Sequence, residues 1–326
     1  MIVDVKTGKE NIKKAVTLSN ICSSEHYVRN GNMQRLIENI SLEVFVGEGV
    51  GVSAQNPVEA RLLMEIIANI RPYYSGRCVL AEKGMMQKKR YILPHLFYID
   101  TPSMVYNNMS VLEFLLFATD PQKTDTITRQ KRFLKMLIDM DYESIAFSRI
   151  SSLSETERIL IEMIIAAESK STLVILNALD FVFSIKEIRA LDTLFNIVKE
   201  HGSVIIGTTQ ASLIGISCEK VAFIIDGQIQ FFGSVSDLCK SWDKVLYLIN
   251  DPEPDKTAKK LSETYSEYTY IVDGSNILVY NYTDHPLSDA DYLRLILDNG
   301  IRPDNIKINK GRVGNSFEEL SRMHGL

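Results

Sequence analysis

Two short runs of purely apolar residues constrain the fold of this 326-residue chain most strongly. The runs at 173–176 and 204–206 each have the length of a strand and contain no polar side chain. Such runs are typical of strands that are buried on both faces of a parallel sheet. The segment 185–198, which lies between them, has the apolar spacing of a helix. Because buried strands alternate with helices, the core is predicted to be α/β.

The stretch 41–70 predicts a strand, a turn and a helix in that order, with helical spacing of apolar residues from Arg61 onward. We expect a loop at 53–60 between the strand and the helix. Nucleotide-binding proteins place their phosphate cradle there, and a working cradle has glycines, a lysine and then a serine or threonine. This loop instead has Pro57, which lacks a backbone N–H, and Glu59, whose negative charge opposes phosphate. The frame of a nucleotide site is therefore expected without its chemical groups.

The flanking segments predict further strands and a helical region. Residues 1–52 are expected to be rich in strands, with a polar loop at 23–34. The pattern over 110–169 is helical, and its first helix begins with the spacing of a capping box, Ser110 followed by Glu113. The dipeptide Asp226-Gly227 between two apolar runs predicts a hairpin.

The segment from 244 to the end has a different pattern, in which strands and helices follow one another as β-α-β-β-α-β. This order is that of the split βαβ, or ferredoxin-like, arrangement. We therefore expect two domains, one spanning 1–240 with the α/β core and one spanning 241–326 with a ferredoxin-like α+β fold.

The composition excludes several classes of protein. A net charge of −5 argues against a general nucleic-acid binder, which usually has a basic face. No apolar run approaches the ~20 residues that a membrane-spanning helix needs, and the first residues lack the apolar core of a signal peptide. The four cysteines form no CxxC pair, which argues against a metal site and favours small buried side chains. We expect a soluble protein that contacts membranes only through a partner.

Between about 15 and 240, the chain resembles the ATP-binding-cassette (ABC) subunits of transporters, through many partial motif matches in the family's order. The stretch 54–62 lies where the family has its phosphate loop, and 98–102 where it has its glutamine loop. The stretch 153–157, LSETE, replaces the signature motif, and 173–178 replaces the strand that ends in two carboxylates. The stretch 208–210, TTQ, replaces the histidine switch, and 221–233 is similar to the closing hairpin. The resemblance implies an ABC-type P-loop NTPase fold, with a mixed sheet and a helical subdomain at about 105–170.

The same resemblance implies that the catalytic groups are missing. The lysine position falls on Ala60 and the hydroxyl position on Arg61, although a shift of one residue would put Arg61 in the lysine's place. The magnesium-ordering aspartate becomes Asn177, and the glutamate that polarises the attacking water becomes Ala178. Gln210 replaces the histidine that contacts the γ-phosphate, and it cannot carry charge.

Four further positions complete the comparison with the family. Asp100 stands for the glutamine that senses metal and water, and Asn56 matches a family residue in the phosphate loop. Tyr27 lies roughly where the family stacks an aromatic ring on adenine, although an ordinary surface tyrosine is the preferred interpretation. In the signature, Ser154 is kept, and it could also serve simply as the N-cap of a helix. These positions are interpreted as a vestigial site, with no catalytic or metal-binding residue and no cofactor expected.

The sequence therefore predicts a catalytically inactive ABC-type subunit. The tail ends in 316–320, SFEEL, which resembles the last segment of subunits that serve drug, bacteriocin and lantibiotic exporters and immunity systems. The resemblance implies an active ABC ATPase and a transmembrane permease as partners, and a cytoplasmic place at the inner face of the membrane. Two alternatives stay open. One is an ABC ATPase that still binds ATP and Mg²⁺ through atypical residues such as Arg61; the other is a soluble protein-interaction module that has left transport.

Overall fold

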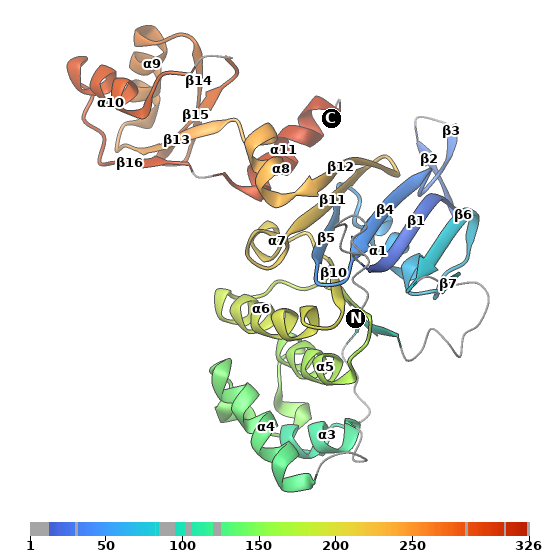
Figure 1. Ribbon diagram of the computed structural model, residues 1–326. Coiled ribbons are helices and arrows are strands. Elements are labelled where there is room, and N and C mark those ends of the chain that lie inside the picture. Colours follow the sequence, from blue (N-terminus) through green and yellow to red (C-terminus); the bar gives the residue numbers. More distant parts are fainter. Residues whose placement is uncertain are drawn as a thin grey trace, which may run out of the picture. The chain divides into compact units, whose positions relative to one another are not determined.

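The computed structural model divides the chain into two compact units, Met1–Ser234 and Val235–Leu326 (Figure 1). The division predicted from the sequence lies at 240/241. The structure describes residues 13–29, 32–81, 83–84, 95–101, 106–119, 125–283, 286–309 and 311–324. The sequence also predicts a basic loop at 83–90, but Lys83–Gly84 forms a short strand and 85–90 lies outside the described residues.

A six-stranded sheet forms the centre of the first unit, and its strands lie in the order β12-β11-β5-β10-β9-β8. All neighbours pair in parallel except β11 and β12, which form the predicted hairpin. The strands β9 and β10 are buried along their whole length, which confirms the prediction of an α/β core. The strand bounds are β5 (Gly49–Ala54), β8 (Leu96–Ile99), β9 (Leu173–Asn177), β10 (Ser203–Gly207), β11 (Lys220–Ile225) and β12 (Gln228–Ser234).

A second, antiparallel sheet with strand order β4-β1-β6-β7 belongs to the same unit. Its strands are β1 (Lys14–Ser23), β4 (Ile40–Phe45), β6 (Tyr73–Leu80) and β7 (Lys83–Gly84). The polar loop predicted at 23–34 is wrong, because most of that segment forms a hairpin of β2 (His26–Arg29) and β3 (Asn32–Arg35). One buried apolar cluster joins this sheet to the central sheet, with the helix α1 (Pro57–Ile67) packed into it.

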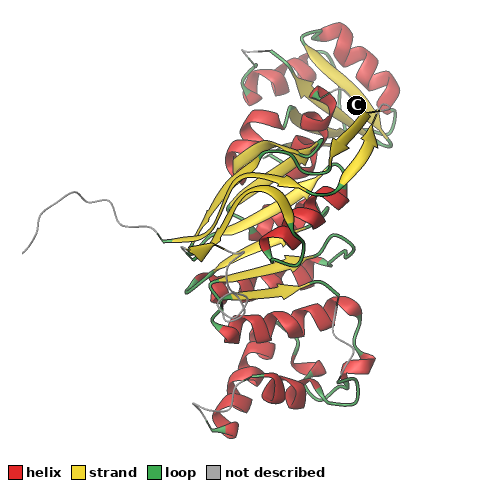
Figure 2. Ribbon diagram, turned by 90° about the vertical axis from the view of Figure 1, so that its right-hand side faces the viewer, coloured by secondary structure: helices red, strands yellow, loops and turns green. Residues whose placement is uncertain are grey.

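The described residues of the predicted helical region include the short 3-10 helices Glu143–Ile145 and Ile150–Ser152. Figure 2 shows that end of the unit as helices without strands. Three α-helices lie among the same described residues. They are α3 (Val111–Ala118), α4 (Thr126–Asp139) and α5 (Glu155–Ser169). Both expected caps are present, since Ser110 with Glu113 and Ser154 with Glu157 each form a complete capping box. The helices α6 (Ile185–Lys199) and α7 (Ala211–Ser217) lie on the central sheet and pack against each other.

The second unit has a four-stranded antiparallel sheet in the order β14-β15-β13-β16. When β13 is counted as strand 1, the order across the sheet is 2-3-1-4, which is the order of the ferredoxin-like arrangement. Two helices bury one face of the sheet around Tyr247 and Tyr292. Its elements are α8 (Val235–Trp242), β13 (Val245–Asn250), α9 (Pro254–Thr264), β14 (Tyr268–Asp273), β15 (Asn276–Asn281), α10 (Asp289–Asp298), β16 (Asn305–Ile308) and α11 (Val313–Met323). Within the described ranges, no helix has the length and apolar character needed to cross a bilayer.

Candidate functional site

The turn between β5 and α1 is much shorter than the sequence predicted. β5 continues to Ala54 and α1 begins at Pro57, so that only Gln55 and Asn56 connect them. The loop predicted at 53–60 is therefore wrong, as is the helix start at Arg61. The physical reason lies in two residues, because Asn56 is a favourable N-cap and proline is favourable in the first helical turn.

The first turn of α1 uses its own backbone donors internally. The N–H of Val58 donates to Oδ1 of Asn56 at 3.1 Å, and the N–H of Glu59 donates to the Asn56 carbonyl at 3.0 Å. The side chain of Glu59 is 2% exposed and Ala60 is fully buried. A phosphate cradle needs several backbone N–H groups that point outward at the anion. This turn instead directs two of them to its cap and holds a carboxylate beside them.

Three of the predicted positions come together around the guanidinium of Arg61. Arg61 pairs with Asp180 at 2.5 Å and with Asp100 at 3.6 Å. Nδ2 of Asn177 donates to Oδ1 of Asp100 at 2.8 Å and approaches the hydroxyl of Tyr98 at 3.4 Å. We call these five residues the Arg61 cluster. The polar groups of the cluster contact one another at this edge of the sheet. In a nucleotide site, groups at these positions would have to face a ligand.

Within the Arg61 cluster, the side chain of Arg61 stays charged and that of Tyr98 stays neutral. The hydrogen bond to Asp180 raises the pKa of Arg61, so its guanidinium stays protonated. Burial, assisted by the charge of Asp100, raises the pKa of Tyr98 to about 12. Asp180 and Tyr98 were not predicted as members of the site. Asp180 follows the buried strand β9 by three residues, which is the sequence signal that could have found it.

Two further predicted positions, Ala178 and Gln210, are buried or hydrogen-bonded within the fold. Ala178 is fully buried, and its N–H donates to the Gly207 carbonyl at 2.7 Å. Gln210 forms two hydrogen bonds with the backbone of Phe183, through Oε1 at 2.9 Å and Nε2 at 2.8 Å. Neither side chain is placed to accept a proton from water, because one has no polar atom and the amide of the other is already bound.

The structure does not bring Tyr27 or Ser154 into the Arg61 cluster. Tyr27 lies on β2, half-buried against the apolar cluster between the two sheets. Ser154 caps α5 and accepts from the N–H of Glu157 at 3.2 Å. The neighbouring Thr156 hydroxyl donates to Glu187, which belongs to the capping box of α6. The segment 153–157 thus links the starts of α5 and α6.

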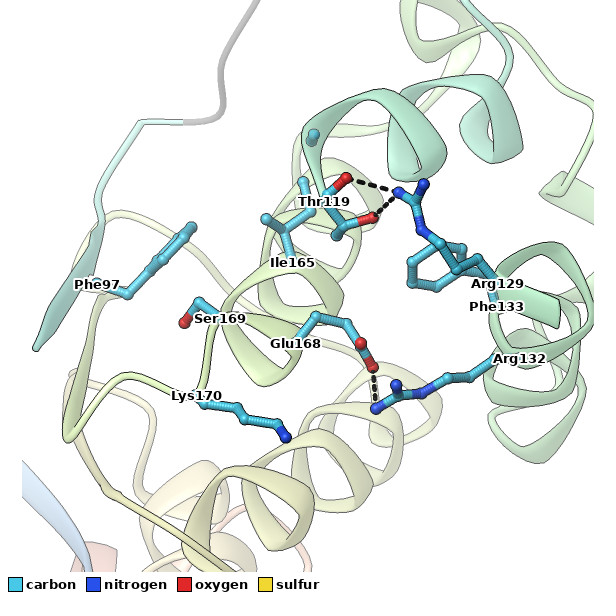
Figure 3. Close-up of a pocket in the computed structure, with 10 residues that line it drawn as sticks. Phe97, Thr119, Arg129, Arg132, Phe133, Ile165, Glu168, Ser169 and Lys170 are labelled. Atoms are coloured by element: carbon cyan, nitrogen blue, oxygen red, sulfur yellow. Dashed lines mark hydrogen bonds and ion pairs between the residues drawn. The ribbon is translucent and has the colours of Figure 1, made fainter. Parts of the chain in front are cut away.

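A separate cavity of about 480 Å³ lies among α3, α4, α5 and β8 (Figure 3). Glu168 and Arg132 point toward each other there and pair at 2.6 Å, while burial raises the pKa of Glu168. Nη2 of Arg129 donates to the carbonyl and the hydroxyl of Thr119, both at 2.6 Å. Because the chain's own groups hold these charges, we assign the cavity to the packing of the helices and not to the predicted site.

Comparison with known proteins points to one class. No protein-family model matches the chain. It is 23% identical over 219 residues to an uncharacterised ABC transporter ATP-binding protein of Methanocaldococcus jannaschii, a match that covers 67% of this chain and 79% of that protein.

Solved structures agree with this match. The ATP-binding subunit of an ABC transporter superposes with a TM-score of 0.57 at 16% identity, covering 70% of this chain and 92% of that one. The protein cbiO1 of Clostridium perfringens, part of the ABC transporter complex cbiONQ, superposes with a TM-score of 0.55 at 16% identity, covering 68% and 89%. The first unit thus has the fold of an ABC ATP-binding cassette, and the sequence match supports an ABC transporter nucleotide-binding domain.

Proposed function

We propose that this chain is an ABC-type subunit that neither binds ATP productively nor hydrolyses it, and that it acts as a structural or regulatory partner in a transporter. The observation that carries the proposal is the start of α1 at Pro57. In this arrangement the backbone donors of Val58 and Glu59 satisfy Asn56, and no lysine follows them. Most of the segment that would bind phosphates, from Pro57 onward, is part of α1.

The groups for hydrolysis support the same proposal. Phosphoryl transfer depends on positioned charges, namely a metal held by a carboxylate and a base that orients water. At these positions the chain has Asn177, bound to Asp100, and the buried Ala178. Gln210 replaces the switch histidine and is bound to Phe183. We infer that no cofactor is used.

The first alternative, an ATPase that relies on Arg61, is disfavoured by the contacts of that side chain. Arg61 would have to leave Asp180 and Asp100 before it could bind a phosphate. Both carboxylates would then face the anion without a neutralising cation. The cost of this exchange opposes nucleotide binding.

The proposed partners are an active ABC ATPase and a transmembrane permease, with the chain at the cytoplasmic face of the membrane. One structural neighbour, cbiO1, is part of a transporter complex, which supports assembly with further subunits. An export or peptide-immunity system is proposed from the resemblance of the tail at 316–320. We take the ferredoxin-like unit to be an appendage of the cassette.

Titration calorimetry of the purified full chain with ATP and Mg²⁺ tests the proposal, with an intact ABC ATPase as the positive control. We expect heats of dilution only, and no phosphate release in a parallel hydrolysis assay. Saturable binding at micromolar ATP would contradict the proposal. Co-purification of the tagged chain with a permease and an active cassette tests the partner role, and recovery of the chain alone would contradict that part.

A further inference from the structure

We propose that Arg61 acts as a built-in cation that ties α1, the end of β8 and the loop after β9 together, so that their arrangement needs neither nucleotide nor metal. The inference rests on the proposed function, because it describes how a cassette without ATP keeps this region ordered.

The sheet register explains why the acidic groups meet at Arg61. β8 and β9 are parallel neighbours in which Ile99 pairs with Leu176. The next residues, Asp100 and Asn177, therefore lie side by side at the carboxyl edge, where their hydrogen bond of 2.8 Å forms. Asp180 follows in the loop after β9, and α1 delivers Arg61 from the other side. The end of β8 and the loop after β9 thus share the guanidinium that α1 supplies.

The charges explain how Arg61 stabilises this arrangement. Its side chain is 31% exposed and stands between two carboxylates, Asp100 at 36% and Asp180 at 68% exposure. If Arg61 lost its charge, the two carboxylates would repel each other without a cation between them. The neutral Asn177 can donate to Asp100, whereas an aspartate there would add a third negative charge.

Because of the position of Asp100 in the chain, its ion pair with Arg61 also affects the helical subdomain. Asp100 directly follows β8, and the chain continues from there to α3 and the helical subdomain. A charge that fixes the end of β8 therefore fixes the point from which the subdomain leaves the central sheet. Elements that end at such junctions absorb much of the backbone change when parts of a protein move. The subdomain is held in place by the chain itself.

Hydrogen–deuterium exchange of the full chain without nucleotide tests this role, using the variant Arg61→Gln. We expect exchange to rise about fivefold in peptides covering 95–101, 106–119 and 178–183, as for the loss of one partly exposed ion pair. Peptides from β13 and β15 in the second unit provide an internal control. The matched variant is Lys14→Gln, which breaks the pair of Lys14 with Glu43 at 2.6 Å in the antiparallel sheet.

The outcomes separate this inference from the proposed function. Unchanged exchange in Arg61→Gln, or the same rise in Lys14→Gln, overturns the inference even where ATP fails to bind. ATP binding to the wild-type chain overturns the proposed function, whatever the exchange of the variant. If Arg61→Gln unfolds the first unit, Asp180→Asn removes only the more exposed carboxylate. That variant must then raise exchange in the same three segments, and an unchanged pattern overturns the inference.

Discussion

Gln210 and Phe183 are joined by two reciprocal hydrogen bonds between one side chain and one backbone unit. Oε1 of Gln210 accepts from the N–H of Phe183 at 2.9 Å, and its Nε2 donates to the carbonyl of the same residue at 2.8 Å. These two hydrogen bonds connect the loop after β9 to the segment that follows β10. The residue at the switch position therefore stabilises the fold of a loop.

Replacing Gln210 with alanine is expected to lower the free energy of unfolding of the first unit by about 1–3 kcal/mol, because two backbone groups lose their partners. Urea unfolding followed by circular dichroism measures this change. Gln55→Ala is the matched control, since Gln55 is exposed and should cost less than about 0.5 kcal/mol. Equal stability of the two variants would contradict a structural role for Gln210.

Asn177→Asp introduces the aspartate that ABC subunits have at the matching position, and we expect it to destabilise the protein. The new carboxylate would lie where Nδ2 now donates to Asp100 at 2.8 Å, so that two negative charges would meet. The expected loss of unfolding free energy is about 1–3 kcal/mol, without any gain of Mg²⁺ binding.

The variant Asn177→Ala separates charge from hydrogen bonding, because it removes the donor and adds no charge. Thermal unfolding with and without Mg²⁺ gives the comparison. If Asn177→Asp were stabilised by Mg²⁺, the site would retain a metal pocket and the prediction would be wrong. If it were no less stable than Asn177→Ala, the charge argument would be wrong.

A side chain at Gly207 is predicted to destabilise the core, because the end of the buried Met64 side chain occupies the adjacent space and would have to repack. A Cβ at Gly207 would lie 1.9 Å from Cε and 2.3 Å from Sδ of Met64, which is fully buried. Gly207→Ala should therefore cost about 1–3 kcal/mol, the usual range for overpacking a core. The double variant Gly207→Ala/Met64→Val should recover part of that loss, since valine is shorter. Additive losses in the double-mutant cycle would show that the two positions do not compete for space.

The sequence was sufficient to predict the architecture because the architecture depends on burial patterns. The runs at 173–176 and 204–206 became the central strands β9 and β10, and the alternation in the tail became a sheet in ferredoxin-like order. Each of these two patterns extends over many residues, so a local irregularity does not change the predicted fold. Caps such as Ser110 and Ser154 were also predictable, because the partner residue lies three positions away.

The site was less predictable because it depends on contacts between distant residues and on one local competition. The apolar stripe predicts a helix start at Arg61, four residues after the actual start of α1 at Pro57. The local start signals are Asn56 as the N-cap and Pro57 in the first turn. The pairing of Arg61 with Asp180 spans 119 positions, and no local pattern encodes it.

The second unit is predicted to lose stability in alkali, because it contains several tyrosines whose pKa is raised. Tyr247 and Tyr292 stack with ring centroids 4.5 Å apart, and burial raises the pKa of both. The hydrogen bond to Glu267 raises the pKa of Tyr265 to about 12. A tyrosine in the unfolded chain loses its proton at about pH 10. The contribution of these tyrosines to the free energy of unfolding is therefore fully present below that pH, and it is lost as the pH rises through their raised pKa in the folded state.

The single tryptophan, Trp242, lies in α8 of the second unit, so its fluorescence reports this transition directly. Tyr292→Phe keeps the stacked ring but removes a hydroxyl that must ionise, and it should move the alkaline midpoint upward. Tyr74→Phe is the control, because Tyr74 is 68% exposed in the first unit and should leave the Trp242 transition in place. A midpoint that does not differ between Tyr292→Phe and wild type would mean that tyrosine ionisation does not drive the unfolding. Since each buried phenol that stays protonated in the folded state adds to the same pH dependence, the shift from one variant should be a fraction of the total.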